Sequence, residues 1–451
     1  MAGDRYPSFG LASPSTPNGV AASEGVALLR GRQASGQSLL AYGNGRSYGD
    51  SCQNVGGTVI DMRSMRSIRS FDAETGVIEA DAGVLLCDII AFAAPHGFFP
   101  AVVPGTQFVT LGGAIANDIH GKNHHRRGTF GCHVVSFTLL RSDGREYRCS
   151  PSENAHLFKA TIGGMGLTGL VVSASIRLMR VGSLDIAQTA TPFRGLGEFF
   201  DLAAEADRAN EYAVAWVDQL ACGPRFGQGI LLAGNHSTDG VCVVPQRSRR
   251  LSVPFQPPVN VLNRPFLSVF NAAYRWQNAR STASRQVGHQ GFFFPLDSVR
   301  DWNRLYGPKG LFQHQSVVPE AAAPEAVPAL LKAAQLAGQG SFLTVLKRFG
   351  GIRSPGLLSF PRPGYTLTLD FPNRGEATLK LLAELDRITL EAGGAVNPYK
   401  DARMGAATFA ASFPQWRRLE ELRDPAFVSD FWARTAGRLP PASPGMVEAA
   451  E

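Results

Sequence analysis

Apolar positions in the first 180 residues form short runs separated by glycine-rich turns. Runs bounded by turn residues predict strands at 38–42, 58–62, 76–83 and 170–178. Leu85 to Ala94 is apolar on most faces and predicts a buried helix, and Asp143-Gly144 predicts the turn of a hairpin over 133–148. Strands and helices in such quick alternation indicate an α+β or α/β unit.

The pattern changes near residue 183, where the glycine clusters stop. Longer helices are predicted at 195–209, 325–337 and 375–392, with strands at 212–217, 228–233, 341–347 and 364–370. Compact motifs return after Gly393, followed by helices predicted at 413–423 and 426–437. We therefore expect a first domain at 1–183, a second at 184–394 and a C-terminal segment at 395–451.

The stretch from Val103 to Gly131 has neither a helical period nor a strand alternation, and it contains six glycines. Glycine loses the most backbone freedom on folding, so such a stretch is costly to order. The cost is tolerated where backbone N–H groups must approach a ligand closely. We interpret the stretch as a wrapping around the phosphates and ring of a cofactor.

Two glycine loops are candidates for phosphate binding. The loop G-N-G-R-S-Y-G-D (43–50) permits a concave nest of N–H groups, although an ordinary turn explains this loop alone equally well. It is neither a dinucleotide fingerprint nor a P-loop, because no helical run and no G-K-[ST] follows. Residues 110–113 offer a second nest. Two nests in one domain suit a pyrophosphate.

Basic side chains crowd the turn that follows the second nest: His120, Lys122, His124 and His125. A metal site is one interpretation of such a cluster. However, two of the histidines are adjacent, and no cysteine or carboxylate completes a ligand set. We expect no metal here, and structural hydrogen bonding is the alternative role.

Composition adds limits on partners and location. The net charge is +7, and no Lys/Arg tract resembles a nucleic-acid arm, so we expect no nucleic-acid partner. The excess favours phosphates or a membrane surface, although ordinary surface variation explains it equally well. Six cysteines without a C-x-x-C pair favour a reducing compartment. No signal peptide or spanning segment is evident, so the expected location is cytoplasmic or peripheral to the inner membrane.

Residues 238–265 combine proline, arginine and apolar side chains, and their length and composition predict a mobile loop. Arg247, Arg249 and Arg250 stand beside Leu251, Val253 and Phe255. This arrangement suits an anionic lipid surface, and a plain solvated loop is the alternative.

Four motifs together resemble the vanillyl-alcohol-oxidase superfamily of flavoproteins, the p-cresol-methylhydroxylase (PCMH) type. They are G-R-S-Y-G-D, P-G-T-x-x-V-T-x-G-G-A-I-A-x-D-I-H-G-K-N-H-H, G-G-x-G-L-T-G and a late Lys-Asp-x-Arg, and the resemblance spans residues 6–440. Within the superfamily the chain resembles the oxidases of decaprenylphosphoryl-β-D-ribose. The resemblance implies an α+β, two-domain PCMH-type FAD-binding fold. In it, 1–183 and 395–451 form the FAD-binding domain, and 184–394 is an inserted substrate domain with an antiparallel sheet flanked by helices.

The resemblance also implies the residues of the site. Lys400 falls on the family's catalytic lysine, with His120 and Tyr48 beside it. The implied FAD contacts are Gly43, Asn44, Gly45, Arg46, Ser47, Tyr48, Gly49, Gly105, Thr110, Leu111, Gly112, Gly113, Asn117, Asp118, Ile119, His120, Val171 and Asn397. The implied substrate contacts are Lys122, Trp216, Arg304, Gln313, Gln315, Lys347, Phe349, Thr366 and Thr368.

This sequence departs from the family at several of these positions. Arg46 stands where relatives with covalent FAD carry histidine, so we predict that FAD is bound non-covalently. Asn397 replaces a tyrosine that contacts the flavin, and Phe293 replaces a pocket tyrosine. Thr366 and Thr368 stand where some members carry asparagine and cysteine.

The implied reaction is the oxidation of a secondary sugar hydroxyl, the 2′-OH of a polyprenyl-phosphoryl-β-D-ribose, to a 2′-keto sugar for cell-envelope arabinose-donor synthesis. A short-chain reductase would then act on the product. Lys400 needs a lowered pKa to take the hydroxyl proton, or, if charged, it stabilises negative charge instead. Alternatives are an oxidase of a soluble sugar lactone or alditol, and a non-catalytic flavin- or lipid-binding scaffold.

Overall fold

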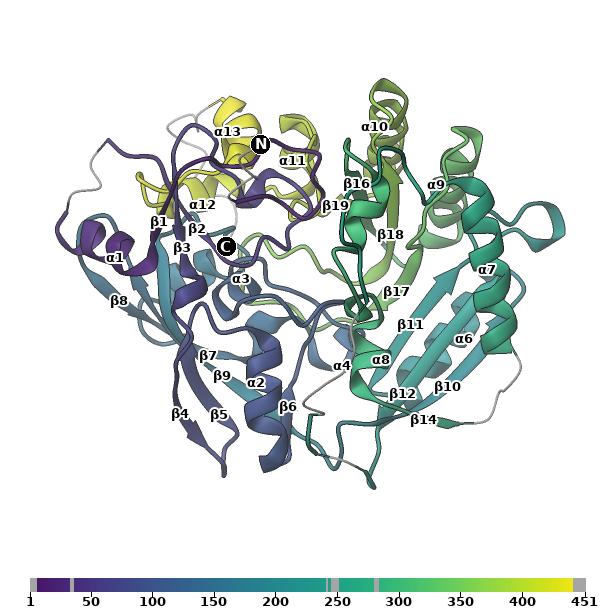
Figure 1. Ribbon diagram of the computed structural model, residues 1–451, viewed down its shortest axis with the longest axis horizontal. Helices are drawn as coiled ribbons and strands as arrows, with labels where there is room; N and C mark the ends of the chain where they lie inside the picture. Colours follow the sequence, from purple (N-terminus) through teal and green to yellow (C-terminus); the bar gives the residue numbers. More distant parts are fainter. Residues whose placement is uncertain (1–5, 33–35, 241, 245–250, 280–283, 441–451) are drawn as a thin grey trace.

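A computed structural model describes residues 6–32, 36–240, 242–244, 251–279 and 284–440. Figure 1 shows two halves side by side, with β4, β5, β7 and β9 in one and β10, β11, β12, β17 and β18 in the other. The main sheet of each half is antiparallel, and helices pack on both. The predicted α+β class is therefore confirmed.

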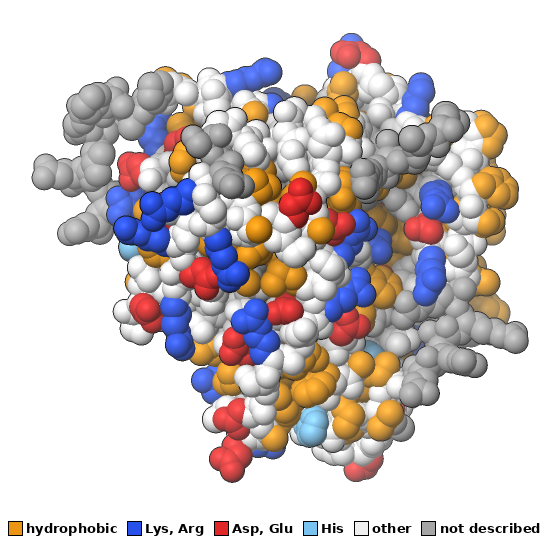
Figure 2. All heavy atoms as spheres, turned by 60° about the vertical axis from the view of Figure 1, so that its left-hand side comes forward, with side chains coloured by type: hydrophobic (Ala, Val, Ile, Leu, Met, Phe, Trp, Pro, Cys, Tyr) orange, Lys and Arg blue, Asp and Glu red, His pale blue; other side chains and the backbone are white. Residues whose placement is uncertain are grey.

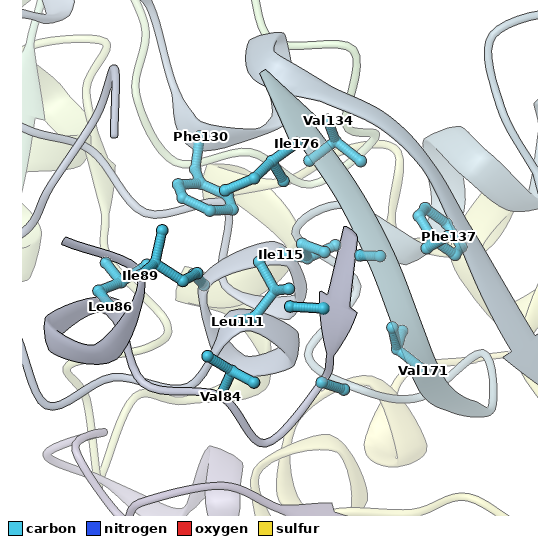
Figure 3. Close-up of a cluster of buried hydrophobic side chains, with 14 of the residues drawn as sticks. Val84, Leu86, Ile89, Leu111, Ile115, Phe130, Val134, Phe137, Val171 and Ile176 are labelled. Carbon is cyan, nitrogen blue, oxygen red and sulfur yellow. The ribbon is translucent and has the colours of Figure 1, made fainter. Parts of the chain in front are cut away.

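The first half contains a six-stranded sheet. Its strands are β4 (Ile68–Asp72), β5 (Val77–Asp81), β9 (Leu170–Arg180), β7 (Val134–Leu140) and β8 (Glu146–Cys149), with β6 (Phe98–Pro100) also paired to β9. β7 and β8 form the predicted hairpin, and Gly144 at its turn has φ +80°. Helices α2 (Leu86–Ala93) and α3 (Leu111–Ala116) bury apolar side chains in the same core as this sheet (Figure 3).

A smaller parallel sheet, in the order β1 (Gly19–Ala21), β3 (Thr58–Asp61) and β2 (Leu39–Tyr42), lies in the same half with α1 (Ala22–Arg30). The C-terminal helices α11 (Ala406–Ser412), α12 (Trp416–Leu422) and α13 (Asp430–Arg434) lie near this sheet (Figure 1). Leu40 and Tyr42 share a core with Phe431 and Trp432. The two ends of the chain therefore pack together, while the domain limits at 183 and 394 stay a prediction.

The second half is an eight-stranded sheet in the order β14-β10-β12-β11-β17-β18-β16-β19. Its strands are β10 (Ile186–Phe193), β11 (Tyr212–Val217), β12 (Gly229–His236), β14 (Arg285–Val287), β16 (Leu311–Val318), β17 (Val345–Phe349), β18 (Gly364–Pro372) and β19 (Ala395–Val396). Helices α6 (Leu196–Ala209), α9 (Ala323–Leu336) and α10 (Glu376–Glu391) cover one face. Side chains alternate across a strand, so Leu367 and Leu369 enter this helix-covered core while Thr368 and Asp370 point to the opposite face.

α3 and α7 (Arg264–Ala279) are among the helices that the sequence pattern did not predict. α3 lies inside the glycine-rich stretch, and the Thr110 side chain caps it by accepting from the Gly113 N–H at 3.2 Å. α7 starts at the end of the predicted mobile loop and packs on β10 and β12. Part of that loop forms the strand β13 (Leu251–Ser252), paired with β15 (Val299–Arg300). Arg247, Arg249 and Arg250 lie outside the described residues.

Candidate active site

A cavity of about 740 Å³ lies between the glycine loops and the polar face of the eight-stranded sheet. Its volume is within the range of cofactor and substrate sites. The predicted residues that line it are Gly43, Asn44, Gly45, Arg46, Ser47, Tyr48, Gly105, Thr110, Gly112, Gly113, Asn117, Asp118, Ile119, His120, Lys122, Val171, Trp216, Gln313, Gln315, Lys347, Thr368, Asn397 and Lys400. The structure thus brings together residues from positions 43 to 400 of the chain.

The two predicted phosphate nests touch one another. A Cβ on Gly43 would lie 2.5 Å from Thr110 Oγ1, so only glycine permits this approach without a shift. Asn44 Nδ2 donates to the Phe108 carbonyl at 2.8 Å and ties the first loop to the second. The nests therefore form one continuous wall of the cavity.

Five predicted residues lie outside the cavity wall. Two of them, Gly49 and Leu111, have structural positions. A Cβ on Gly49 would lie 1.6 Å from the Asp401 carbonyl oxygen, so Gly49 permits the loop to contact the turn that carries Lys400. Leu111 is fully buried and points into the apolar core (Figure 3).

The other three contact residues of the wall or its rim. The Phe349 ring packs edge-on against His120 at 5.0 Å between centroids, and Thr366 Oγ1 accepts from Gln315 Nε2 at 3.1 Å. Arg304 instead donates to the Val253 carbonyl at 2.9 Å and contacts Asp301. Phe349 and Thr366 thus support residues of the wall, while Arg304 lies beside the loop at 251–261.

A chain of amide hydrogen bonds holds His120. Gln315 Nε2 lies 2.9 Å from His120 Nε2, and Gln315 Oε1 accepts from Asn397 Nδ2 at 2.8 Å. Because the glutamine amide nitrogen is a donor, His120 Nε2 accepts and the ring is neutral. Burial, with Lys347 nearby, holds the pKa of His120 well below its usual value, which agrees with this tautomer.

Three lysines converge on the cavity. Burial lowers the pKa of Lys122 and of Lys347 to about 7, and that of Lys400 to about 8. Lys347 also lowers the pKa of Lys122, and Lys400 that of Lys347, because like charges oppose one another. The Lys400 ammonium lies 4.5 Å from the centroid of the Tyr48 ring. Such a cluster favours an anionic ligand.

Asp370 is the acidic group that acts on Lys400, and its presence raises the lysine pKa. The carboxylate is fully buried on β18, opposite Gln313 in the ladder, and Gln313 Nε2 donates to it at 2.5 Å. Burial raises the pKa of Asp370 to about 7. Asp370 was not predicted from the sequence. The alternation of side chains along a strand nevertheless places it on the same face of β18 as Thr366 and Thr368.

The basic residues after Lys122 join the two halves. Arg127 pairs with Glu211 at 2.7 Å, and His125 Nε2 contacts the Asn210 carbonyl at 3.0 Å. His124 packs on the Phe349 ring at 4.6 Å between centroids. Their role is structural, and no group of three metal-ligating side chains occurs in the part of the chain that the structure describes.

Residues 21–150 match the family model described as an FAD binding domain. The chain is 36% identical over 426 residues to the decaprenylphosphoryl-beta-D-ribose oxidase of Mycolicibacterium smegmatis, covering 90% of this chain and 91% of that protein. The chain belongs to the decaprenylphosphoryl-ribose oxidase family. It is an FAD-dependent oxidoreductase that acts on CH–OH groups. An uncharacterised Streptomyces coelicolor protein is 31% identical over 75% of this chain and 96% of its own length, and mouse L-gulonolactone oxidase is 28% identical over 30% of each chain.

The residues of the cavity fit FAD. Gly105 lines the cavity, and a Cβ there would meet no atom within 4 Å, so its backbone is open to a ligand. The buried Nε of Arg46, also on the wall, has no hydrogen-bond partner among the described residues. Cys52 also lines the cavity, but burial raises the pKa of its thiol to about 12, so it is not a nucleophile at neutral pH.

We expect Gly105→Leu to fold normally and to bind FAD at least about tenfold more weakly, because the new side chain would occupy ligand space. Gly56→Leu is the matched control, since a Cβ there also meets no atom within 4 Å but lies away from the cavity. Flavin content after purification and the thermal midpoint of each variant measure the two effects. Equal FAD content in both variants would contradict the placement of the cofactor.

Proposed function

We propose that the protein oxidises the 2′-hydroxyl of a polyprenyl-phosphoryl-β-D-ribose to the 2′-keto sugar. Bound FAD supplies the acceptor for the hydride from the carbinol carbon. The remaining requirements are a base for the hydroxyl proton, polar groups for the sugar and positive charge for the phosphate. The convergence of Lys122, Lys347 and Lys400 in one cavity is the observation that carries the proposal.

The lysines favour a phosphorylated substrate over a neutral one. Burial lowers the pKa of all three lysines, and the charged groups that add to this effect or oppose it are other lysines and the carboxylate of Asp370. A lysine ammonium without a nearby anion is unfavourable in a buried site. A phosphodiester anion would stabilise the protonated lysine there. A neutral lactone, such as the substrate named for L-gulonolactone oxidase, offers no such compensation.

We assign the proton transfer to Lys400. With a pKa of about 8, roughly a tenth of this amine is free at pH 7 and about half at pH 8, against almost none for an ordinary lysine. The Tyr48 ring packs against the Lys400 side-chain nitrogen, and burial raises the pKa of the Tyr48 hydroxyl well above 10, so Tyr48 is a neutral hydrogen-bonding group. Neutral His120 orients the substrate through the amide chain to Gln315.

The cavity wall suggests how the two ligands divide it. We propose that the loops at 43–48 and 105–113, with Asn117–His120, Val171 and Asn397, hold FAD. The sheet face would hold the sugar phosphate. Its contacts would be Lys122, Trp216, Gln313, Gln315, Lys347 and Thr368, and Phe349 and Thr366 would support them from behind.

Anaerobic mixing with a polyprenyl-phosphoribose tests the proposed function. We expect the oxidised-flavin absorbance to bleach in one turnover, with a keto sugar as product. Bleaching by a soluble lactone or alditol, without any by the phosphoribose lipid, would replace this function with that alternative. Flavin that no alcohol reduces would identify a non-catalytic scaffold.

Acid precipitation of the purified protein is expected to release all of its flavin into the supernatant. Arg46 occupies the position of the covalent histidine, and its guanidinium lies over the rings of Phe9 and Phe108, 5.4 and 5.6 Å from their centroids. Guanidinium is permanently protonated and forms no flavin bond. Yellow colour retained in the pellet would contradict non-covalent binding.

The product implies further partners. A keto sugar on a lipid carrier needs a reductase to restore a hydroxyl, and we propose a short-chain reductase in that role. A polyprenyl substrate resides in a membrane, so we propose peripheral membrane contact at the inner membrane. No helix in the described ranges is long and apolar enough to span a bilayer.

A further inference from the structure

Six of the large apolar side chains that are exposed come from one segment of the chain, between Leu251 and Trp276. Three stand in β13 and the loop after it, where Leu251, Phe255 and Val259 are 73%, 68% and 66% exposed. Three more stand on α7, where Phe266, Val269 and Trp276 are 43%, 72% and 60% exposed. We call these six residues the apolar face. Apolar patches of this kind mark interaction sites in soluble proteins.

The two faces of α7 differ. Phe266, Val269 and Trp276 recur at spacings of three and seven residues, which places them along one stripe of the helix. The opposite stripe is buried, with Leu267 in a core cluster and Tyr274 against the Trp216 ring at 4.9 Å. The helix is therefore anchored by one stripe and presents the other to the surroundings.

The sequence around the apolar face is exceptional in charge. Residues 240–296 contain seven arginines and no Lys, Asp or Glu, a net charge of +7. The whole chain has 44 basic and 37 acidic residues, so the remainder has 37 of each and is neutral. Figure 2, which turns the left-hand side of Figure 1 forward, shows basic and acidic side chains interspersed on that face. The excess positive charge of the protein thus belongs to one segment.

The same segment borders the cavity. Tyr274 of α7 lines it, and so do Val299 and Arg300 of β15, the strand that pairs with β13. Leu262 and Leu267 pack in one cluster with Tyr48, which lines the cavity and contacts Lys400. A ligand that leaves the cavity past Tyr274 or Arg300 therefore reaches the segment that carries the apolar face.

We propose that the apolar face docks the protein on a bilayer of anionic phospholipid. Apolar side chains enter the interface and an exposed arginine of the segment, Arg264 at the start of α7, binds lipid phosphate, a combination that stabilises peripheral attachment. A second copy of this chain would place two segments of charge +7 together, which is unfavourable. The purpose of this docking rests on the proposed function. A polyprenyl chain would remain in the bilayer while its sugar phosphate enters the cavity.

Co-sedimentation of the FAD-loaded protein with vesicles tests this docking. We expect binding to phosphatidylcholine vesicles that contain phosphatidylglycerol to exceed binding to pure phosphatidylcholine by about tenfold or more, and to weaken with salt. The double variant Val269→Glu/Trp276→Glu should lower binding to the anionic vesicles about tenfold. Leu336→Glu is the matched control, because Leu336 is 89% exposed on α9, outside the segment.

Three results would each overturn the proposal. The double variant could keep its vesicle binding, the Leu336→Glu control could lose as much binding as the double variant, or the wild-type protein could stay in the supernatant. The proposal would also be overturned by a double variant that turns a wild-type dimer into a monomer while the wild type ignores vesicles, because the face would then join two copies. Bleaching by a short-chain, water-soluble phosphoribose should be the same in all variants. That assay fails alone if the proposed function is wrong, and vesicle binding fails alone if the docking surface is wrong.

Discussion

Replacing Lys400 with methionine is expected to slow flavin reduction by the sugar substrate by about 10² to 10⁴-fold, the usual contribution of a general base. Methionine retains most of the side-chain volume, so FAD binding and the thermal midpoint should change little. Stopped-flow reduction under anaerobic conditions measures the rate. Lys380→Met is the control, since Lys380 is exposed on α10 and pairs with Glu376 at 3.9 Å.

The pH dependence of the same rate distinguishes the two roles of Lys400. Burial lowers its pKa from 10.5 to about 8, so the free amine increases as the pH rises through 8. A base must be unprotonated, and we therefore expect the rate to rise through about pH 8 and then level off. A rate that falls across this range would assign the charged form, which stabilises negative charge, instead.

Asp370 provides a second test of this assignment. Its carboxylate raises the pKa of Lys400, so Asp370→Asn should move the rising limb of the profile to lower pH. The amide keeps the shape of the side chain, and a purely structural role would leave the midpoint of the profile unchanged. Asp207→Asn is a suitable comparison, because Asp207 is a buried carboxylate outside the cavity, paired with Arg348 at 3.3 Å.

Local patterns predicted most of the regular structure. The apolar runs at 38–42 and 170–178 became β2 and β9, and the 375–392 pattern became α10. These elements follow from side-chain periodicity, which is local in sequence. α3 was hidden because Gly112 and Gly113 are poor helix formers, and Thr110 and packing in the core stabilise it instead.

The chemistry of the cavity depends on contacts that are not local. The resemblance indicated Lys400, but burial lowers its pKa and Asp370, 30 residues earlier in the chain, partly offsets that effect. The roles of His124 to Arg127 required the position of Glu211 and Phe349, which no spacing reveals. Gly49 was expected to contact FAD, and its tight approach to Asp401 depends on how the C-terminal segment packs back onto the first domain.

The packing of the C-terminal segment depends on Arg434. Replacing this arginine is expected to have a large effect on the free energy of unfolding. Arg434 of α13 binds both carboxylate oxygens of Asp50, at 2.6 and 2.9 Å, and Asp401 at 3.1 Å. Asp50 and Asp401 are 6% and 4% exposed, and burial already raises the pKa of Asp50. Arg434→Ala would leave the buried carboxylate of Asp50 without its cation and Asp401 with Arg403 alone, which costs about 3 to 5 kcal/mol in the free energy of unfolding.

The same bonds connect stability to catalysis. Asp50 follows Tyr48 by two residues, and Asp401 is adjacent to Lys400, so Arg434 holds both sides of the Tyr48–Lys400 contact. Denaturant unfolding of Arg434→Ala should show the loss of stability, and the flavin reduction rate should fall with it. Arg387→Ala, which removes exposed ion pairs with Glu384 and Glu391 on α10, should leave stability almost unchanged. If Arg434→Ala were no less stable than Arg387→Ala, the C-terminal segment would have to be positioned by its apolar core alone, through Phe431 and Trp432.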